Sequence, residues 1–214
     1  MHRMKNLWKY NGKKYLASAC TIIALCCLIA SGAYTIYLTP AISGSESAVN
    51  TYLSIYDFAL FAIAYMLILI GNLQGTTLAY QGMLIYVFMT LFSAILAFFE
   101  NGFLNIGIFW EGNPLSIILL LLVLLFDALI ITTGIMTYVR TAQYLRNSYS
   151  NYTGLKIWCL FFAIFNTLLY GVEPALLAID GSNIAILLLV LEPLSQVFIG
   201  WAIFFTITRL KTEY

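Results

Sequence analysis

Charged side chains are scarce in this 214-residue chain: only 9% of its residues are Asp, Glu, Lys or Arg, while 62% are hydrophobic. Soluble globular domains contain about 25% charged and about 45–50% apolar residues. So few charges do not suffice for a surface that faces water. The mean hydropathy of +0.93 indicates instead a chain embedded in lipid. The composition therefore argues against a disordered protein, a nucleic-acid-binding protein and a secreted disulfide scaffold.

Histidine is almost absent, since its single copy, His2, lies in the basic N-terminal segment. Histidine-based haem, zinc and triad sites are therefore excluded from the apolar spans. The sequence also has no Walker motif, no glycine-rich dinucleotide fingerprint and no HExxH motif. Its four cysteines fall in apolar stretches without CxxC spacing, which is typical of small hydrophobic filler. We expect no catalytic residues, no metal and no cofactor.

Long apolar runs dominate the rest of the chain. A bilayer core about 30 Å thick requires about 20 apolar residues in a helix. Six stretches reach that length, with approximate limits 15–38, 52–73, 78–99, 115–139, 155–179 and 184–208. Outer-membrane β-strands would instead alternate apolar and polar residues over about ten positions. The sequence predicts an all-α polytopic membrane protein, in which residues 1–214 form a single transmembrane domain of six helices.

Lysine and arginine are missing from every second connection. All ten basic residues lie before the first span, around the link 140–154, or after the sixth span. The connections 39–51, 100–114 and 180–183 carry as charged residues only Glu46, Glu100, Glu111 and Asp180, and the short link 74–77 carries no charge. Basic connections stay on the cytoplasmic side of a membrane. The pattern therefore predicts that both termini are cytoplasmic, and the small size favours a bacterial cytoplasmic membrane.

Four carboxylic acids lie inside the apolar spans with no Lys, Arg or His at similar depth: Asp57, Asp127, Glu173 and Glu192. A carboxylate at the bilayer centre costs about 2.5–3.5 kcal/mol even on the lenient insertion scale. Each acid must therefore be protonated, share a proton, hold a cation, or face water or a basic partner. At 1.5 Å per residue, Asp57 and Glu173 lie about 8–9 Å from the outer end, Glu192 about 12 Å and Asp127 about 18 Å. Acids that descend from an acidic rim to the midplane would attract cations from outside.

Polar side chains accompany two of these acids at helical spacing. Asn166 and Tyr170 share a helix face with Glu173, and Gln196 shares one with Glu192. Such residues line a cavity in one interpretation and join helices by hydrogen bonds in the other. A proline follows both glutamates, and the kink that it causes frees backbone oxygens that can bind an ion. Proline kinks are also tolerated in membrane helices without any such role.

The four acids are not equivalent candidates. Asp57 lies close enough to the interface to be hydrated, and the neighbouring Tyr52 and Tyr56 suit an aromatic belt. A peripheral, solvated acid is therefore an alternative to a site residue there. Asp127 has leucine and isoleucine on all sides, so we rank it first and Glu192 second.

Three functions remain open. The first is a transport protein or membrane-embedded solute-binding subunit, with an outward-opening acidic cavity for a cation, a proton or a cationic small molecule. Its ligands would be Asp127, Glu173, Glu192 and Asp57, with Asn166, Tyr170 and Gln196 as neutral groups. The second is a non-catalytic subunit or scaffold, whose acids pair with a partner membrane protein or with another copy of the chain. The third is an enzyme that modifies lipids by acid–base chemistry, which lacks a recognisable constellation here.

Overall fold

The computed structural model describes residues 14–33, 47–99, 114–146, 152–178 and 185–209, and these ranges contain helices and no strands. An N-terminal helix, Lys14–Ala33, precedes five further helices. These are α2 (Ser47–Gln74), α3 (Leu78–Phe99), α5 (Pro114–Leu145), α6 (Tyr152–Ala178) and α7 (Ala185–Arg209). Six helices of the described part are long and apolar enough to cross a membrane. The predicted all-α architecture with six membrane-spanning helices is thereby confirmed.

Several helices extend beyond the predicted spans. The clearest case is α5, which continues to Leu145 and gives the helix 32 residues, or about 48 Å at 1.5 Å per residue. The link that we placed at 140–154 is therefore helical over its first part, and that expectation of a loop is wrong there. Arg140 donates a hydrogen bond to Gln143 one turn later, at 3.2 Å. Hydropathy marks the apolar part of a helix, whereas its backbone hydrogen bonds continue into the polar part.

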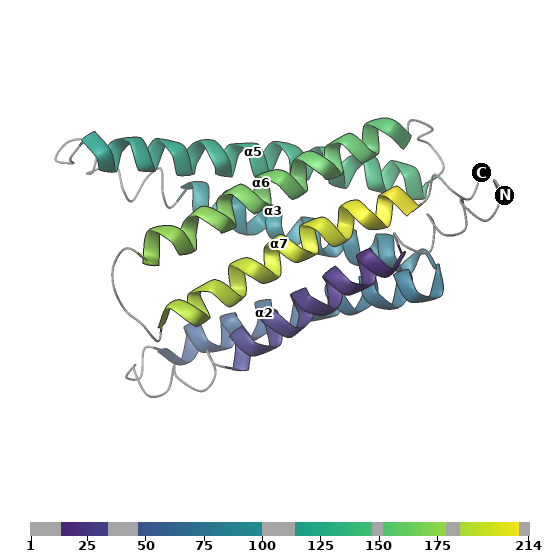
Figure 1. Ribbon diagram of the computed structural model, residues 1–214, viewed down its shortest axis with the longest axis horizontal. Helices are drawn as coiled ribbons and strands as arrows, with labels where there is room; N and C mark the ends of the chain where they lie inside the picture. Colours follow the sequence, from purple (N-terminus) through teal and green to yellow (C-terminus); the bar gives the residue numbers. More distant parts are fainter. Residues whose placement is uncertain (1–13, 34–46, 100–113, 147–151, 179–184, 210–214) are drawn as a thin grey trace.

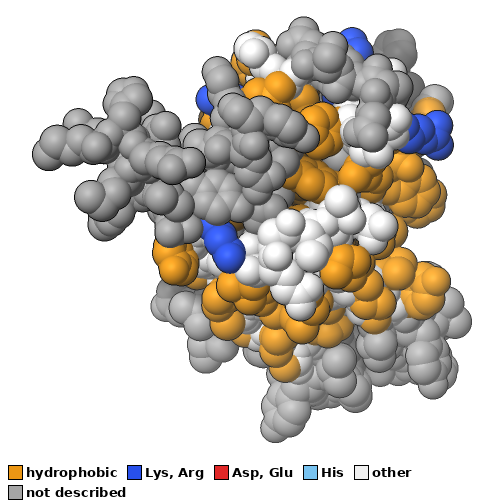
Figure 2. Space-filling view, turned by 90° about the vertical axis from the view of Figure 1, so that its right-hand side faces the viewer, with side chains coloured by type: hydrophobic (Ala, Val, Ile, Leu, Met, Phe, Trp, Pro, Cys, Tyr) orange, Lys and Arg blue, Asp and Glu red, His pale blue; other side chains and the backbone are white. Residues whose placement is uncertain are grey.

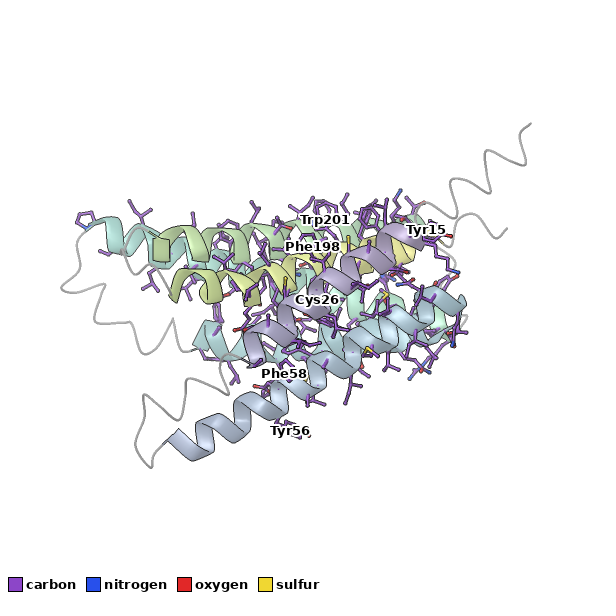
Figure 3. The ribbon with its side chains drawn as sticks, turned by 60° about the horizontal axis from the view of Figure 1, so that its bottom comes forward. Tyr15, Cys26, Tyr56, Phe58, Phe198 and Trp201 are labelled. Carbon is purple, nitrogen blue, oxygen red and sulfur yellow. The ribbon has the colours of Figure 1, made fainter. Side chains whose placement is uncertain are left out.

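The helices run side by side along the long axis of the molecule, with marked tilts between them (Figure 1). The main contacts follow chain order, from α2 with α3 to α6 with α7. The turn between α2 and α3 is tight because Gly75 has a φ of 71°, a left-handed conformation that glycine adopts without strain and that commonly ends a helix. The N-terminal helix packs across α2, where Phe58 lies against Gly32 (Figure 3).

Close backbone approach fixes the pairing of α2 with α3. A Cβ atom added to Gly82 would lie 2.7 Å from the carbonyl oxygen of Ala64 and 2.8 Å from the backbone nitrogen of Ile68. Small residues let membrane helices approach in this way, because lipid supplies no hydrophobic force between them. Large apolar side chains such as Phe88, Phe92 and Leu121 are exposed on the bundle surface, as expected for a surface that contacts lipid.

The described basic side chains gather at one end of the bundle, which we call the basic end. Lys14 begins the N-terminal helix, Arg146 follows α5 and Lys156 lies near the start of α6. Figure 2, which views the bundle from one end of its long axis, shows Lys and Arg side chains around the apolar residues and no Asp or Glu among the described atoms. The basic part of the charge pattern that underlies the predicted topology is therefore present in space. The side of the membrane on which this end lies stays a prediction.

Candidate functional site

Two tyrosines occupy the centre of the bundle. Tyr65 on α2 and Tyr86 on α3 are both fully buried, and their ring centroids lie 5.9 Å apart. Phe61 packs against both rings, at 6.4 Å and 5.9 Å between centroids. Both tyrosines lie near the middle of the apolar segments Tyr56–Gln74 and Leu78–Phe99. A tyrosine buried so far from water needs a hydrogen-bond partner for its hydroxyl group.

The Tyr65 hydroxyl finds its partner on α7. It lies 3.0 Å from the Ser195 Oγ atom, and Ser195 in turn donates to the backbone oxygen of Ala24, also at 3.0 Å. A serine hydroxyl has one hydrogen to donate. Because Ser195 gives that hydrogen to Ala24, Tyr65 must be the donor in its own bond with Ser195. The chain of hydrogen bonds therefore runs from α2 through α7 to the N-terminal helix.

The Tyr86 hydroxyl also bonds to α7. It donates to the Oε1 atom of Gln196 at 2.7 Å, and both residues are buried. Gln196 is one of the predicted ligands, and it lies at the centre of the bundle beside Ser195. Its carbonyl oxygen is already engaged by the tyrosine.

Asn166 lies on the adjacent face of α6 and is fully buried. Its β-carbon would lie 3.7 Å from a Cβ atom added to Gly200 of α7. Its Nδ2 atom donates to the backbone oxygen of Phe162 at 2.9 Å. Within the part of the chain that the structure describes, its Oδ1 atom is buried and accepts no hydrogen bond. A buried acceptor without a donor is unfavourable and is a reason to look for a ligand.

Tyr170 and Glu192 complete this group. Tyr170 lies one turn beyond Asn166 and interacts electrostatically with both Tyr65 and Tyr86. Glu192 interacts with Tyr65 in the same way, although the glutamate itself is exposed. Of the predicted residues, Gln196 is hydrogen-bonded to this tyrosine pair, whereas Tyr170 and Glu192 lie within electrostatic range of it.

Asp127 is buried on α5, with 3% of its surface exposed. It follows the start of α5 at Pro114 by 13 residues, or about 20 Å at 1.5 Å per residue. Two turns further along the same side of α5, Gly134 faces Leu91 of α3 and Phe162 of α6. This carboxylic acid is thus enclosed by protein within a membrane-spanning helix, as its apolar neighbours in the sequence predict.

The remaining two acids are Asp57 and Glu173. Asp57 is exposed on α2, and it is not among the groups that interact with the tyrosine pair. Glu173 belongs to α6, but its side chain lies outside the described residues. The shared acidic cavity of all four residues therefore stays a prediction.

Other polar residues of the spans join helices to one another. Asn72 of α2 donates to Thr206 of α7 at 2.8 Å, and the indole nitrogen of Trp201 donates to Thr167 of α6 at 3.1 Å. Such bonds between helices are common in bilayers. The helix-joining interpretation therefore applies to Gln196, which accepts a hydrogen bond from Tyr86. The carbonyl oxygen of Asn166 has no partner in the described part of the chain, and the cavity-lining interpretation stays a prediction.

Tyr65 is the central residue that our sequence reasoning missed. A tyrosine at the end of a span belongs to an aromatic belt, but this one lies near the middle of its segment. That depth was the available signal, since a hydroxyl group in hydrocarbon requires a partner.

Among the described residues, no group of three or more His, Cys, Asp or Glu side chains could hold a metal ion. Comparison with protein-family models, with curated proteins and with solved structures gives no match. The functional argument therefore depends on the chemistry of the buried polar centre.

Proposed function

We propose that this membrane protein is a transport protein or a solute-binding membrane subunit, and that its solute is a cation, a proton or a cationic small molecule. Asp127 and Glu192 supply negative charge, and Asn166, Tyr170 and Gln196 supply neutral oxygen ligands. The role is not enzymatic, and the basic end of the bundle faces the cytoplasm. The solute enters from the opposite side.

The observation that carries this proposal is the burial of Asp127, which is 3% exposed within an apolar helix. An ionised carboxylate in such surroundings is costly unless it is paired or hydrogen-bonded. A cation or proton that reaches the buried acid would neutralise it and would itself be stabilised. Ionisable groups inside membrane helices commonly mark the path of a transported ion for this reason.

The test is uptake by proteoliposomes that contain the full-length protein. Candidate cations and a proton gradient are supplied outside, and flux is compared among wild type, Asp127→Asn and Glu192→Gln. We expect both substitutions to abolish uptake while the protein still inserts and folds. The matched control is Asn72→Leu. It removes a buried polar group that donates a hydrogen bond to Thr206, nearer the basic end than the tyrosines. This variant should retain uptake. Unaltered flux in both acidic variants would overturn the assignment of these residues.

A second candidate function is supported by the exposure of Asp57 on α2. An exposed acid within a membrane-spanning helix is a suitable partner for a basic residue of another membrane protein. In this alternative the chain is a scaffold or subunit of a complex. Asp57→Asn would then release the partner during purification in mild detergent, whereas the transport proposal expects a chain that responds to cations without a partner.

A further inference from the structure

The helices packed against α5 show which residues share the depth of Asp127. Both neighbours run antiparallel to α5, which proceeds toward the basic end while α3 and α6 proceed away from it (Figure 1). Gly134 of α5 faces Leu91 of α3 and Phe162 of α6. Asp127 comes seven residues before Gly134. It therefore lies at the depth of the residues that come about seven places after Leu91 and after Phe162.

Neither neighbour has a basic residue at that depth. The end of α3 is the apolar run AILAFF, and Glu100, which follows it, lies outside the described residues. The matching part of α6 has two ionisable residues, Tyr170 and Glu173, and the side chain of Glu173 is not described. On α5 itself the nearest basic residue, Arg140, is thirteen positions further on, or about 20 Å at 1.5 Å per residue. The negative charge of Asp127 is therefore balanced by something other than a Lys, Arg or His of these three helices.

Burial limits the states in which Asp127 is stable. The residue is 3% exposed, and a carboxylate enclosed within a membrane helix is costly unless its charge is balanced. Two balanced states are open to it: the acid that carries its own proton, and the carboxylate that holds a bound cation. Hydrogen bonds from neighbouring groups can accompany either state, but they do not change the net charge. A cation and a proton therefore compete for this one carboxylate.

We propose that Asp127 exchanges a proton for the transported cation. This inference rests on the proposed function and names the ion to which cation binding is coupled. When the cation binds, the O–H bond of the carboxylic acid breaks, the proton passes to water, and the carboxylate holds the cation. Release of the cation reverses both steps. Cation binding to a group that must first lose a proton releases that proton, so a proton gradient can drive the cation across the membrane.

The first test counts protons on the unmodified, full-length protein in lipid nanodiscs. The probes are sodium, potassium and tetramethylammonium chlorides, because none of these cations itself gains or loses a proton. Calorimetry in buffers of different ionisation enthalpy should show one proton released for each cation bound. Protons compete less as the pH rises, so binding should become about tenfold tighter for each unit of pH.

The outcomes of this test separate the two proposals. Binding without proton release, at an affinity that does not change with pH, would overturn the exchange and leave a cation-binding protein standing. Failure of all three cations to bind would also overturn the exchange. It would overturn the proposed function as well if proteoliposomes took up no protons either.

The second test identifies the group that releases the proton. Asp127→Asn should lose both cation binding and proton release, whereas Asp127→Glu keeps an acid and should keep the release. Asn72→Leu, the matched control, should behave as wild type. A proton still released when a cation binds to Asp127→Asn would contradict the assignment to this residue. If Asp127→Asn does not fold, infrared difference spectra of the wild type decide the matter. The C=O band of a protonated carboxyl group should weaken when the cation is added, and an unchanged band would overturn the exchange.

The third test measures coupling in proteoliposomes with equal concentrations of the bound cation on both sides. An acidic interior should drive accumulation of the isotopically labelled cation, and a protonophore should abolish that accumulation. Asn72→Leu should keep this response. Uptake that is the same with and without the pH gradient would overturn the exchange and leave uncoupled cation transport.

Discussion

The hydrogen bond between Tyr86 and Gln196 gives a prediction that the geometry fixes closely. Tyr86→Phe removes the hydroxyl group and keeps the ring, so the packing against Phe61, Tyr65 and Phe162 is retained. What is lost is the 2.7 Å bond to the Oε1 atom of Gln196. The Gln196 oxygen then has one hydrogen-bond donor fewer, and water hardly reaches it because the residue is 5% exposed.

The expected cost follows from two measured ranges. A buried acceptor without its donor costs about 1–3 kcal/mol in soluble proteins. Hydrogen bonds between membrane helices are worth about 0.6 kcal/mol on average and about 1.7 kcal/mol at most. Because both partners here are almost inaccessible and their bond is short, we expect Tyr86→Phe to lower the free energy of unfolding by about 1–1.7 kcal/mol.

The assay is unfolding by SDS in mixed micelles, followed by circular dichroism. A double-mutant cycle of Tyr86→Phe with Gln196→Leu should give a coupling of at least about 0.5 kcal/mol. The control cycle pairs Tyr86→Phe with Asn72→Leu, whose hydrogen bond is to Thr206 instead. Those two effects should add to within about 0.3–0.5 kcal/mol. If the coupling of Tyr86 with Gln196 is no larger than that of the control pair, the central hydrogen-bond network is refuted.

Four further predictions test the fold and the topology. Gly82→Ala should destabilise the protein by about 1–3 kcal/mol, because the added carbon would lie 2.7 Å from the Ala64 oxygen. Gly200→Ala should be neutral or stabilising by about 0.5–1 kcal/mol, because the nearest atom to the added carbon is 3.5 Å away. If Gly200→Ala destabilised the protein more than Gly82→Ala in SDS unfolding, the packing of α2 with α3 would be contradicted. Asn72→Leu should cost about 0.6–1.7 kcal/mol in the same assay, and no loss would show that the bond to Thr206 contributes nothing. A membrane-impermeant maleimide should label Arg146→Cys only after the cells are permeabilised, and labelling in intact cells would place the basic end outside.

The number and position of the helices could be predicted from the sequence because the bilayer imposes a length and forbids unpaired backbone groups. The apolar run 78–99 coincides with α3, which spans Leu78–Phe99. The end of α5 could not be found in this way. Its last two turns carry Arg140 and Gln143, which are polar and still helical, so a signal based on hydropathy stops too early.

The contacts of the polar residues were beyond the reach of the sequence. Ser195 bonds to Tyr65 and Ala24, which are 130 and 171 positions away. Helical spacing shows which residues share a face, but it does not show which neighbouring helix that face meets. Tyr86, Thr90 and Ser93 follow one another at helical spacing on α3, yet the first two are buried and Ser93 is exposed.

For the acids too, the sequence predicts the surroundings along the helix but not the contacts with other helices. The apolar neighbours of Asp127 predicted an enclosed side chain, and the structure has it 3% exposed. The proximity of Asp57 to the interface left two alternatives, and its exposure on α2 suits both a hydrated acid and one that pairs with a partner protein. For Glu192, the sequence predicted its depth in the membrane and showed the proline that follows it. Its interaction with Tyr65 depends instead on how α2 and α7 pack.

The most direct measurement is the binding isotherm of candidate inorganic and organic cations for purified wild type and for Asp127→Asn, recorded by equilibrium dialysis in lipid nanodiscs. Asparagine is nearly the same size as aspartate but cannot carry its charge. We predict saturable binding to the wild type and its loss in Asp127→Asn, with both proteins unfolding at similar SDS concentrations. Equal isotherms for the two proteins would contradict the claim that this buried acid serves a cation.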